Sequence, residues 1–315
     1  MIKLNISMGV VDFMGFILLN TLGFILTISL GYTLKQKGIF KQEDGKVLSK
    51  LFLYVTLPAT IIVGVNGTII NARTFSFISL GILFNLILAL IGFGMGKKAS
   101  HTEKVLLMIT TASFNIGGFT IPFVYGLMPH AVAYVSMFDI GNALMLTGGT
   151  LVLSTILIKT KEKQQSTLSA LKALIKNPIF VTYIIMFSLS LLSIEIPDFL
   201  LSPLRLLSNA NSFIAMFTIG LFMRLSLNKS GWKFVRTLLI TRYASSIALA
   251  LFIFFLFPVE LFLRQILVLI VLSPIANLPL IQATELGGDE GVFGICGSVS
   301  ILTSLILMTA AMLLM

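Results

Sequence analysis

The sequence predicts an all-α polytopic membrane protein in which ten transmembrane helices form two halves of five helices each. Three observations support this prediction: an apolar composition, ten hydrophobic segments of membrane-spanning length, and helix-breaking residues at corresponding places in the two halves. Of the 315 residues, 57% are hydrophobic and 11% are charged, whereas a soluble domain has about 25% charged residues. So few charges cannot cover the surface of a soluble protein of this size.

The ten segments are apolar over the roughly 20 residues that a helix needs to cross the hydrocarbon core. No small-residue cleavage site follows the first segment, so we expect a retained helix and not a signal peptide. The sixth segment has start signals of its own, because Asn177 can cap a helix and Pro178 suits its first turn. The expected bounds are 11–34, 47–66, 74–96, 104–128, 131–158, 178–196, 206–226, 234–257, 262–286 and 290–314.

The positive charges predict the orientation, because lysine and arginine gather in cytoplasmic loops. All but four of the 22 basic residues lie near alternate loops, which places both termini outside. A nucleic-acid surface is not expected, because no basic run alternates with aromatic residues. Arg205 and Arg242 are expected at helix ends with their charges at the membrane surface, and attraction of an anion is the alternative for both. The four exceptions to the loop pattern are Lys3, Arg73, Arg205 and Arg264.

The chain divides into a first repeat (1–158), a cytoplasmic linker (159–177) and a second repeat (178–315). Five helices are an odd number, so the two repeats enter the membrane from opposite sides, as in the inverted repeats of secondary transporters. The polar positions support this symmetry: Asn115 precedes Gly126 by eleven residues, and Asn277 precedes Gly287 by ten.

Helix-breaking residues interrupt the fourth and ninth segments, in "FNIGGFTIPF" and "SPIANLPLIQ". Lipid cannot satisfy the freed backbone groups, so these breaks must lie inside protein or line a cavity. A half-helix that begins at a break offers free N–H groups and partial positive charge to an anion. A proline kink or a tightly packed motif is the alternative. The expected substrate-binding residues are Asn115, Gly117, Gly118, Pro122, Pro274, Asn277 and Pro279.

Asp139 and Asn142 lie within the fifth segment. An acid inside a membrane is costly and is therefore a functional candidate, here for coupling to H⁺ or Na⁺. The alternative is an acid that is satisfied by Asn142 or by a neighbouring helix. No cofactor and no metal site are expected, since the chain has one cysteine and two histidines.

The same motifs resemble the auxin efflux carrier family, which includes plant auxin exporters and bacterial malate and malonate permease-like proteins. The resemblance extends over nearly the whole chain and depends on the order of its motifs. It implies a scaffold domain and a transport domain, each drawn from both repeats, with the fourth and ninth helices crossing. It also implies elevator-like movement of organic anions, with substrate contacts at Asn115, Asn277 and the crossing prolines. The matching segments are 31–62, "FNIGGFTIP" (114–122), "DIGN" (139–142), "NP" (177–178) and "SPIANLPLIQATELGGDE" (273–290).

The expected function is therefore secondary transport of a small organic anion, such as a carboxylate, by a permease of the bacterial inner membrane. Expected partners are the substrate, the lipid bilayer and a second copy bound through the scaffold helices. A sodium-coupled symporter of the bile-acid type and a membrane ligand sensor of the same fold remain as alternatives. An enzyme is not expected, because the sequence has no metalloprotease motif and no paired intramembrane aspartates.

Overall fold

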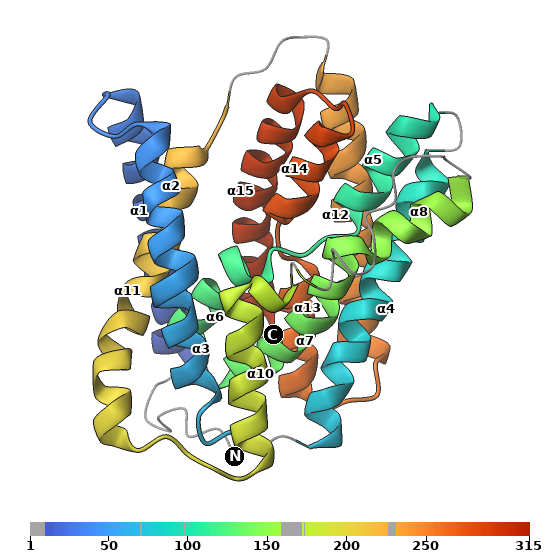
Figure 1. Cartoon of the computed structure of the whole chain (residues 1–315). Coiled ribbons are helices and arrows are strands. Elements are labelled where there is room, and N and C mark those ends of the chain that lie inside the picture. Colours follow the sequence, from blue (N-terminus) through green and yellow to red (C-terminus); the bar gives the residue numbers. More distant parts are fainter. Residues whose placement is uncertain (1–9, 70, 97–98, 159–171, 173, 226–230) are drawn as a thin grey trace.

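The computed structural model describes residues 10–69, 71–96, 99–158, 172, 174–225 and 231–315, and these residues form helices and turns with no strand among them (Figure 1). Most of the predicted linker 159–177 lies outside the described residues. The helices are α1 (Val10–Gln36), α2 (Gln42–Leu51), α3 (Leu57–Val65), α4 (Ala72–Met95), α5 (His101–Thr111), α6 (Ile121–Leu127), α7 (Val132–Leu144), α8 (Thr150–Ile158), α10 (Pro178–Leu191), α11 (Asp198–Phe222), α12 (Trp232–Leu256), α13 (Leu261–Val271), α14 (Asn277–Glu285) and α15 (Glu290–Leu314).

Seven helical segments within the described residues are long and apolar enough to cross a membrane, and they coincide with seven of the ten expected segments. The other three expected segments correspond to α10, α11 and the interrupted pair α13 and α14. Of these, α10 and α13 are shorter apolar helices. The protein is thus an all-helical, multi-pass membrane protein, and the count of ten spans stays a prediction. The seven segments are Met14–Gln36, Gln42–Val65, Ala72–Met95, His101–Leu127, Pro129–Ile158, Trp232–Leu256 and Glu290–Leu314.

The boundaries around the turn between α10 and α11 differ from those expected. The start of α10 is as predicted, because the Asn177 side chain accepts a hydrogen bond from the Ile179 amide at 2.9 Å. The helix ends at Leu191, before Ser193, whose positive φ of 56° is incompatible with a continuing helix. The expected start of the next helix at 206 was wrong, because α11 already begins at Asp198 and continues through Pro203.

The helices pack in two groups. The first, called the α1 group, contains α1, α2, α3, α10 and α11, with α11 packed against α1, α2 and α3. The second, called the α4 group, contains α4 to α8 and α12 to α15, with α4 packed against α5 and α7. Figure 1 shows α1, α2 and α11 on one side of the molecule and α4, α5, α12, α14 and α15 on the other. The groups meet where α11 contacts α6, where α3 and α10 contact α7, and where α1 contacts α15.

Close pairs of glycines hold helices together inside each group. In the α1 group, Gly31 of α1 and Gly220 of α11 lie so close to the opposite backbone that a Cβ atom at either would collide with it. In the α4 group, Gly81 of α4 and Gly141 of α7 lie equally close to the opposite backbone. Small residues allow such close backbone approach in membrane proteins, where packing replaces the hydrophobic effect between helices.

Candidate functional site at the crossing of two interrupted helices

The first interruption lies between α5 and α6. The helix α5 ends at Thr111, residues 112–115 are not helical, and a π-helical turn over Ile116–Thr120 leads into α6. The Asn115 carbonyl starts this turn by accepting the amides of Phe119 and Thr120 at 3.2 and 3.0 Å. Pro122 is buried near the start of α6 and cannot donate a hydrogen bond to a carbonyl of the π-helical turn before it.

The second interruption lies between α13 and α14. The helix α13 ends at Val271, residues 273–276 are not helical, and α14 begins at Asn277. Pro274 lies within the interruption, whereas Pro279 is buried in the first turn of α14. Pro274 is therefore the proline within the interruption, whereas Pro279 lies near the start of α14, as Pro122 lies near the start of α6.

The two interruptions are hydrogen-bonded to each other. The backbone N–H of Asn115 donates to the Pro274 carbonyl at 2.9 Å, and the backbone N–H of Ala276 donates to Ser113 Oγ at 3.4 Å. The Ile275 amide reaches Ser300 Oγ of α15 at 3.3 Å. Backbone groups that lipid would leave unsatisfied thus find partners inside the protein, and residues as far as 163 sequence positions apart form one site.

The asparagine side chains at the crossing have no hydrogen-bond partner among the described residues. Asn115 is 6% exposed, and Asn277 is exposed at the start of α14. Gly118 makes room for the first of them, because a Cβ atom at this position would collide with Asn115 Oδ1. A Cβ at Gly117 would instead lie 3.4 Å from Leu57 and 3.8 Å from Asp139 Oδ2. The structure therefore brings Asn115, Gly117, Gly118 and Asp139 together.

Asp139 is held by two donors. The Asn142 amide donates to Asp139 Oδ1 at 2.8 Å, and the Tyr183 hydroxyl donates to Oδ2 at 2.9 Å. The Asn142 amide also donates to the Phe114 carbonyl at 2.9 Å, which ties the network to the crossing. Asn85 Nδ2 donates to Asn142 Oδ1 at 3.2 Å. The expected alternative, an acid satisfied by Asn142 and by a neighbouring helix, matches this geometry.

Arg242 is a site residue that the sequence analysis placed wrongly. It was expected at a helix end, but it lies well inside α12 with an exposed fraction of 0%. Its Nη1 donates to the Thr111 carbonyl and its Nη2 to the Ser273 carbonyl, both at 3.0 Å. Its guanidinium lies 4.7 Å from the centre of the Phe114 ring. One feature of the sequence could have predicted this burial: Arg242 lies in the middle of an apolar segment and not at its end. By contrast Arg205, near the start of α11, is exposed and pairs with Asp198.

Sequence comparison identifies the family. The family model described as "Membrane transport protein" matches residues 16–315. The chain belongs to this family. It is the auxin efflux carrier-like family that the sequence motifs predicted. The uncharacterized transporter MJ1031 of Methanocaldococcus jannaschii is 24% identical over 213 residues, which cover 64% of this chain. The match spans 66% of the length of that relative.

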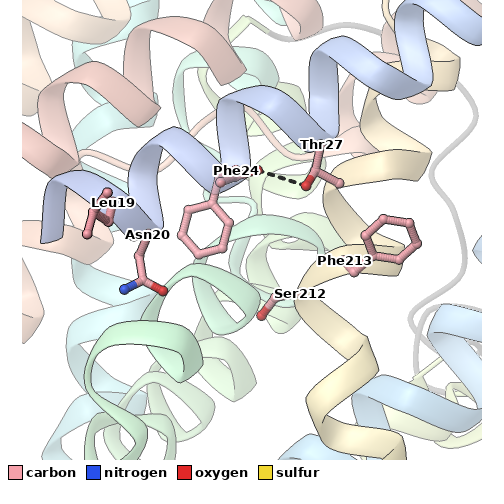
Figure 2. Close-up of a pocket in the computed structure, with 7 residues that line it drawn as sticks. Leu19, Asn20, Phe24, Thr27, Ser212 and Phe213 are labelled. Atoms are coloured by element: carbon pink, nitrogen blue, oxygen red, sulfur yellow. Dashed lines mark hydrogen bonds between the residues drawn. The ribbon is translucent and has the colours of Figure 1, made fainter. Parts of the chain in front are cut away.

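A cavity in this membrane transport protein adjoins the first interrupted helix (Figure 2). Its volume is about 320 Å³, and it lies between α1 and α11. The Ser212 hydroxyl in its wall donates to the Pro122 carbonyl at 2.7 Å, and the Phe24 ring lies 5.6 Å from that of Phe123. The cavity therefore borders α6 where the two helix groups meet. Its lining residues are Leu19, Asn20, Gly23, Phe24, Thr27, Ser212 and Phe213.

Proposed function

We propose that this chain is a secondary transporter of small organic anions, with carboxylates as the substrate class. The observation that carries the proposal is the hydrogen-bonded crossing of two interrupted helices, with Asn115 and Asn277 side chains that lack partners among the described residues. Interrupted helices that meet inside a membrane protein are the usual substrate sites of secondary transporters.

The charge distribution at the crossing favours an anion. The start of α14 lies at the exposed Asn277, and the first N–H groups of a helix have no partner within it and carry partial positive charge. Arg242 adds a full positive charge, and no carboxylate of the described residues forms an ion pair with it. Amide groups of asparagine can then bind carboxylate oxygens without adding a charge of their own.

We also propose ten spans in two inverted repeats, with the termini outside because lysine and arginine gather in alternate loops. Each repeat contributes one interrupted helix, α5 with α6 and α13 with α14. We assign the α1 group as the scaffold domain and the α4 group as the transport domain, and we expect the second to move past the first as an elevator. The exposed apolar face of α1 and α11 suits lipid or a second copy of the chain in the inner membrane.

The position of Asp139 beside the first interruption favours one alternative, a symporter in which this acid couples transport to H⁺ or Na⁺. A Cβ atom built at Gly117 would lie 3.8 Å from Asp139 Oδ2. A ligand sensor of the same fold would bind the anion without moving it. Flux measured in proteoliposomes distinguishes a carrier from a sensor. The dependence of that flux on imposed H⁺ and Na⁺ gradients distinguishes a coupled carrier from an uncoupled carrier.

The site assignment is tested by Asn115→Ala and Asn277→Ala. A panel of carboxylates is first screened on the purified wild-type protein by thermal shift, and the best ligand is then used in flux assays. Each substitution should lower its flux or affinity by about tenfold or more, the equivalent of one hydrogen bond to a charged group.

The matched control is Asn209→Ala, because Asn209 is an exposed asparagine of α11, a helix that contains neither interruption. It should transport as the wild type does. If both crossing variants fold and retain wild-type flux, the crossing is not the substrate site. If no carboxylate raises the melting temperature of the wild-type protein or is transported by it, the proposed substrate class is wrong.

A further inference from the structure

Arg242 is a buried cation, and no carboxylate of the described part of the chain lies beside it as a counter-ion. A charged side chain within a membrane-spanning segment is costly and is kept where it serves a function. No Asp or Glu of the described residues pairs with the guanidinium, and its Nε has no hydrogen-bond partner there. What stabilises the charge must therefore be the carbonyl groups and the ring that surround it.

Those carbonyl groups share one property. Thr111 is the last residue of α5, and Ser273 lies two residues beyond the end of α13. Both half-helices thus direct their C-terminal ends, which carry partial negative charge, at the same guanidinium. The planar fork of arginine can reach two acceptors at once, whereas the ammonium group of lysine has no such fixed geometry.

The Phe114 ring completes the surroundings of Arg242. It belongs to the first interruption and lies 4.7 Å from the guanidinium, within the range of a cation–π contact. The Phe114 carbonyl accepts from Asn142, so the same residue links Arg242 to the Asp139 network. Arg242 thereby contacts both interruptions from a third helix, α12.

We propose that Arg242 is a fixed internal cation that joins the two half-helix ends at the place where a mobile coupling cation would otherwise bind. The proposal rests on the transport function proposed above. Half-helix C-terminal ends and unwound carbonyls are the groups with which other secondary transporters bind Na⁺. Here the carbonyls of Thr111 and Ser273 are occupied by the guanidinium, so Arg242 acts as a positioning residue for the crossing.

The test is Arg242→Ala with and without free guanidinium chloride. The substitution leaves the two carbonyls without a donor and opens a space of guanidinium size. Flux should fall by about tenfold to a hundredfold, the range of one or two hydrogen bonds to a charged group. Free guanidinium at non-denaturing concentration should restore flux and raise the melting temperature of the variant.

Arg264→Ala is the matched control. Arg264 also donates to two carbonyls, those of Val259 at 2.8 Å and Phe254 at 3.1 Å, but outside the crossing. Free guanidinium should restore nothing in this variant and should not stabilise it. Two results would overturn the proposal. In the first, Arg242→Ala melts like the wild type, loses flux and does not respond to guanidinium. In the second, Arg242→Ala transports as fast as the wild type.

Two further measurements keep the test independent of how Arg242→Ala folds. Wild-type flux should be equal in Na⁺ and in N-methylglucamine buffers, and a strict requirement for Na⁺ would contradict a fixed cation. Arg242→Lys keeps the charge without the fork, so it should fold and transport more slowly than the wild type. Absence of any wild-type carboxylate flux would count against the transport function, whereas guanidinium-dependent melting of Arg242→Ala tests the cation site by itself.

Discussion

The crossing depends on individual residues whose size, charge or hydrogen bonds other residue types would not reproduce. Gly118 is such a residue because its missing side chain leaves room for the Asn115 amide. Arg242 is another, because its two donors reach the ends of two half-helices. Asn142 is a third, since its single amide bonds both to Asp139 and to the Phe114 carbonyl. At this scale the site is a set of polar groups that helix interruptions bring within hydrogen-bonding distance.

Gly118→Ala should impair binding without removing any polar group. The new Cβ atom would collide with Asn115 Oδ1 and turn the amide away from the crossing. We expect the affinity for the transported anion to fall by about tenfold, as for one lost hydrogen bond to a charged group. Titration of the ligand in a thermal-shift assay measures this. Gly15→Ala, which meets no atom within 4 Å, should bind like the wild type, and equal affinities of the two variants would refute the steric argument.

At the scale of elements, hydrophobic length and capping signals predicted most helices. They gave the start of α10 at Asn177 and the interruptions in the fourth and ninth segments. They missed the start of α11, because Asp198 and Pro203 resemble a loop in sequence. Asp198 suits the first turn of a helix, but Pro203 lies inside α11, where a proline normally predicts a break. They also misplaced Arg242, because a charge in an apolar segment is normally read as a helix end. The Tyr183 partner of Asp139 came from a different helix, and no local pattern encodes such a contact.

Gly141→Ala should destabilise the packing of α7 on α4. A Cβ atom at Gly141 would collide with the Ile78 carbonyl, which is backbone and cannot turn aside. Overpacking of this kind costs about 1–3 kcal/mol, so the melting temperature in detergent should fall clearly. Gly94→Ala in α4 is the control, because nothing lies within 4 Å of its Cβ. It should melt at or above the wild-type temperature, since alanine favours a helix more than glycine does. A Gly141→Ala protein of unchanged melting temperature would contradict the close packing.

At the scale of the whole molecule, the two helix groups meet through contacts that a sliding movement must break. Tyr125 of α6 and Ser208 of α11 share a hydrogen bond of 2.8 Å across this boundary. Arg73 and Glu260, by contrast, form an ion pair within the α4 group. An elevator mechanism therefore predicts that these two pairs differ in how they tolerate a covalent link.

Cross-linking of Tyr125→Cys with Ser208→Cys should stop transport. The experiment uses a Cys296→Ala background and a flexible thiol-reactive linker, with flux measured before and after the reaction. Linking Arg73→Cys with Glu260→Cys should leave flux unchanged, because both residues belong to the α4 group, which we propose to move as one body. Undiminished flux in the first linked variant would exclude movement of α6 relative to α11.

Besides the Arg224–Glu290 ion pair, hydroxyl groups make several hydrogen bonds across this boundary among the described residues. Among them are bonds that join Thr21 to Thr309, Tyr125 to Ser208, Ser212 to the Pro122 carbonyl, and Tyr183 to Asp139. A hydroxyl turns about one bond and both donates and accepts, so it can exchange one partner for the next as the surfaces shift. Each such exchange replaces a hydrogen bond of about 1 kcal/mol net value with another of similar strength. In the movement that we propose, the boundary could therefore shift without leaving these polar groups unpaired inside the membrane.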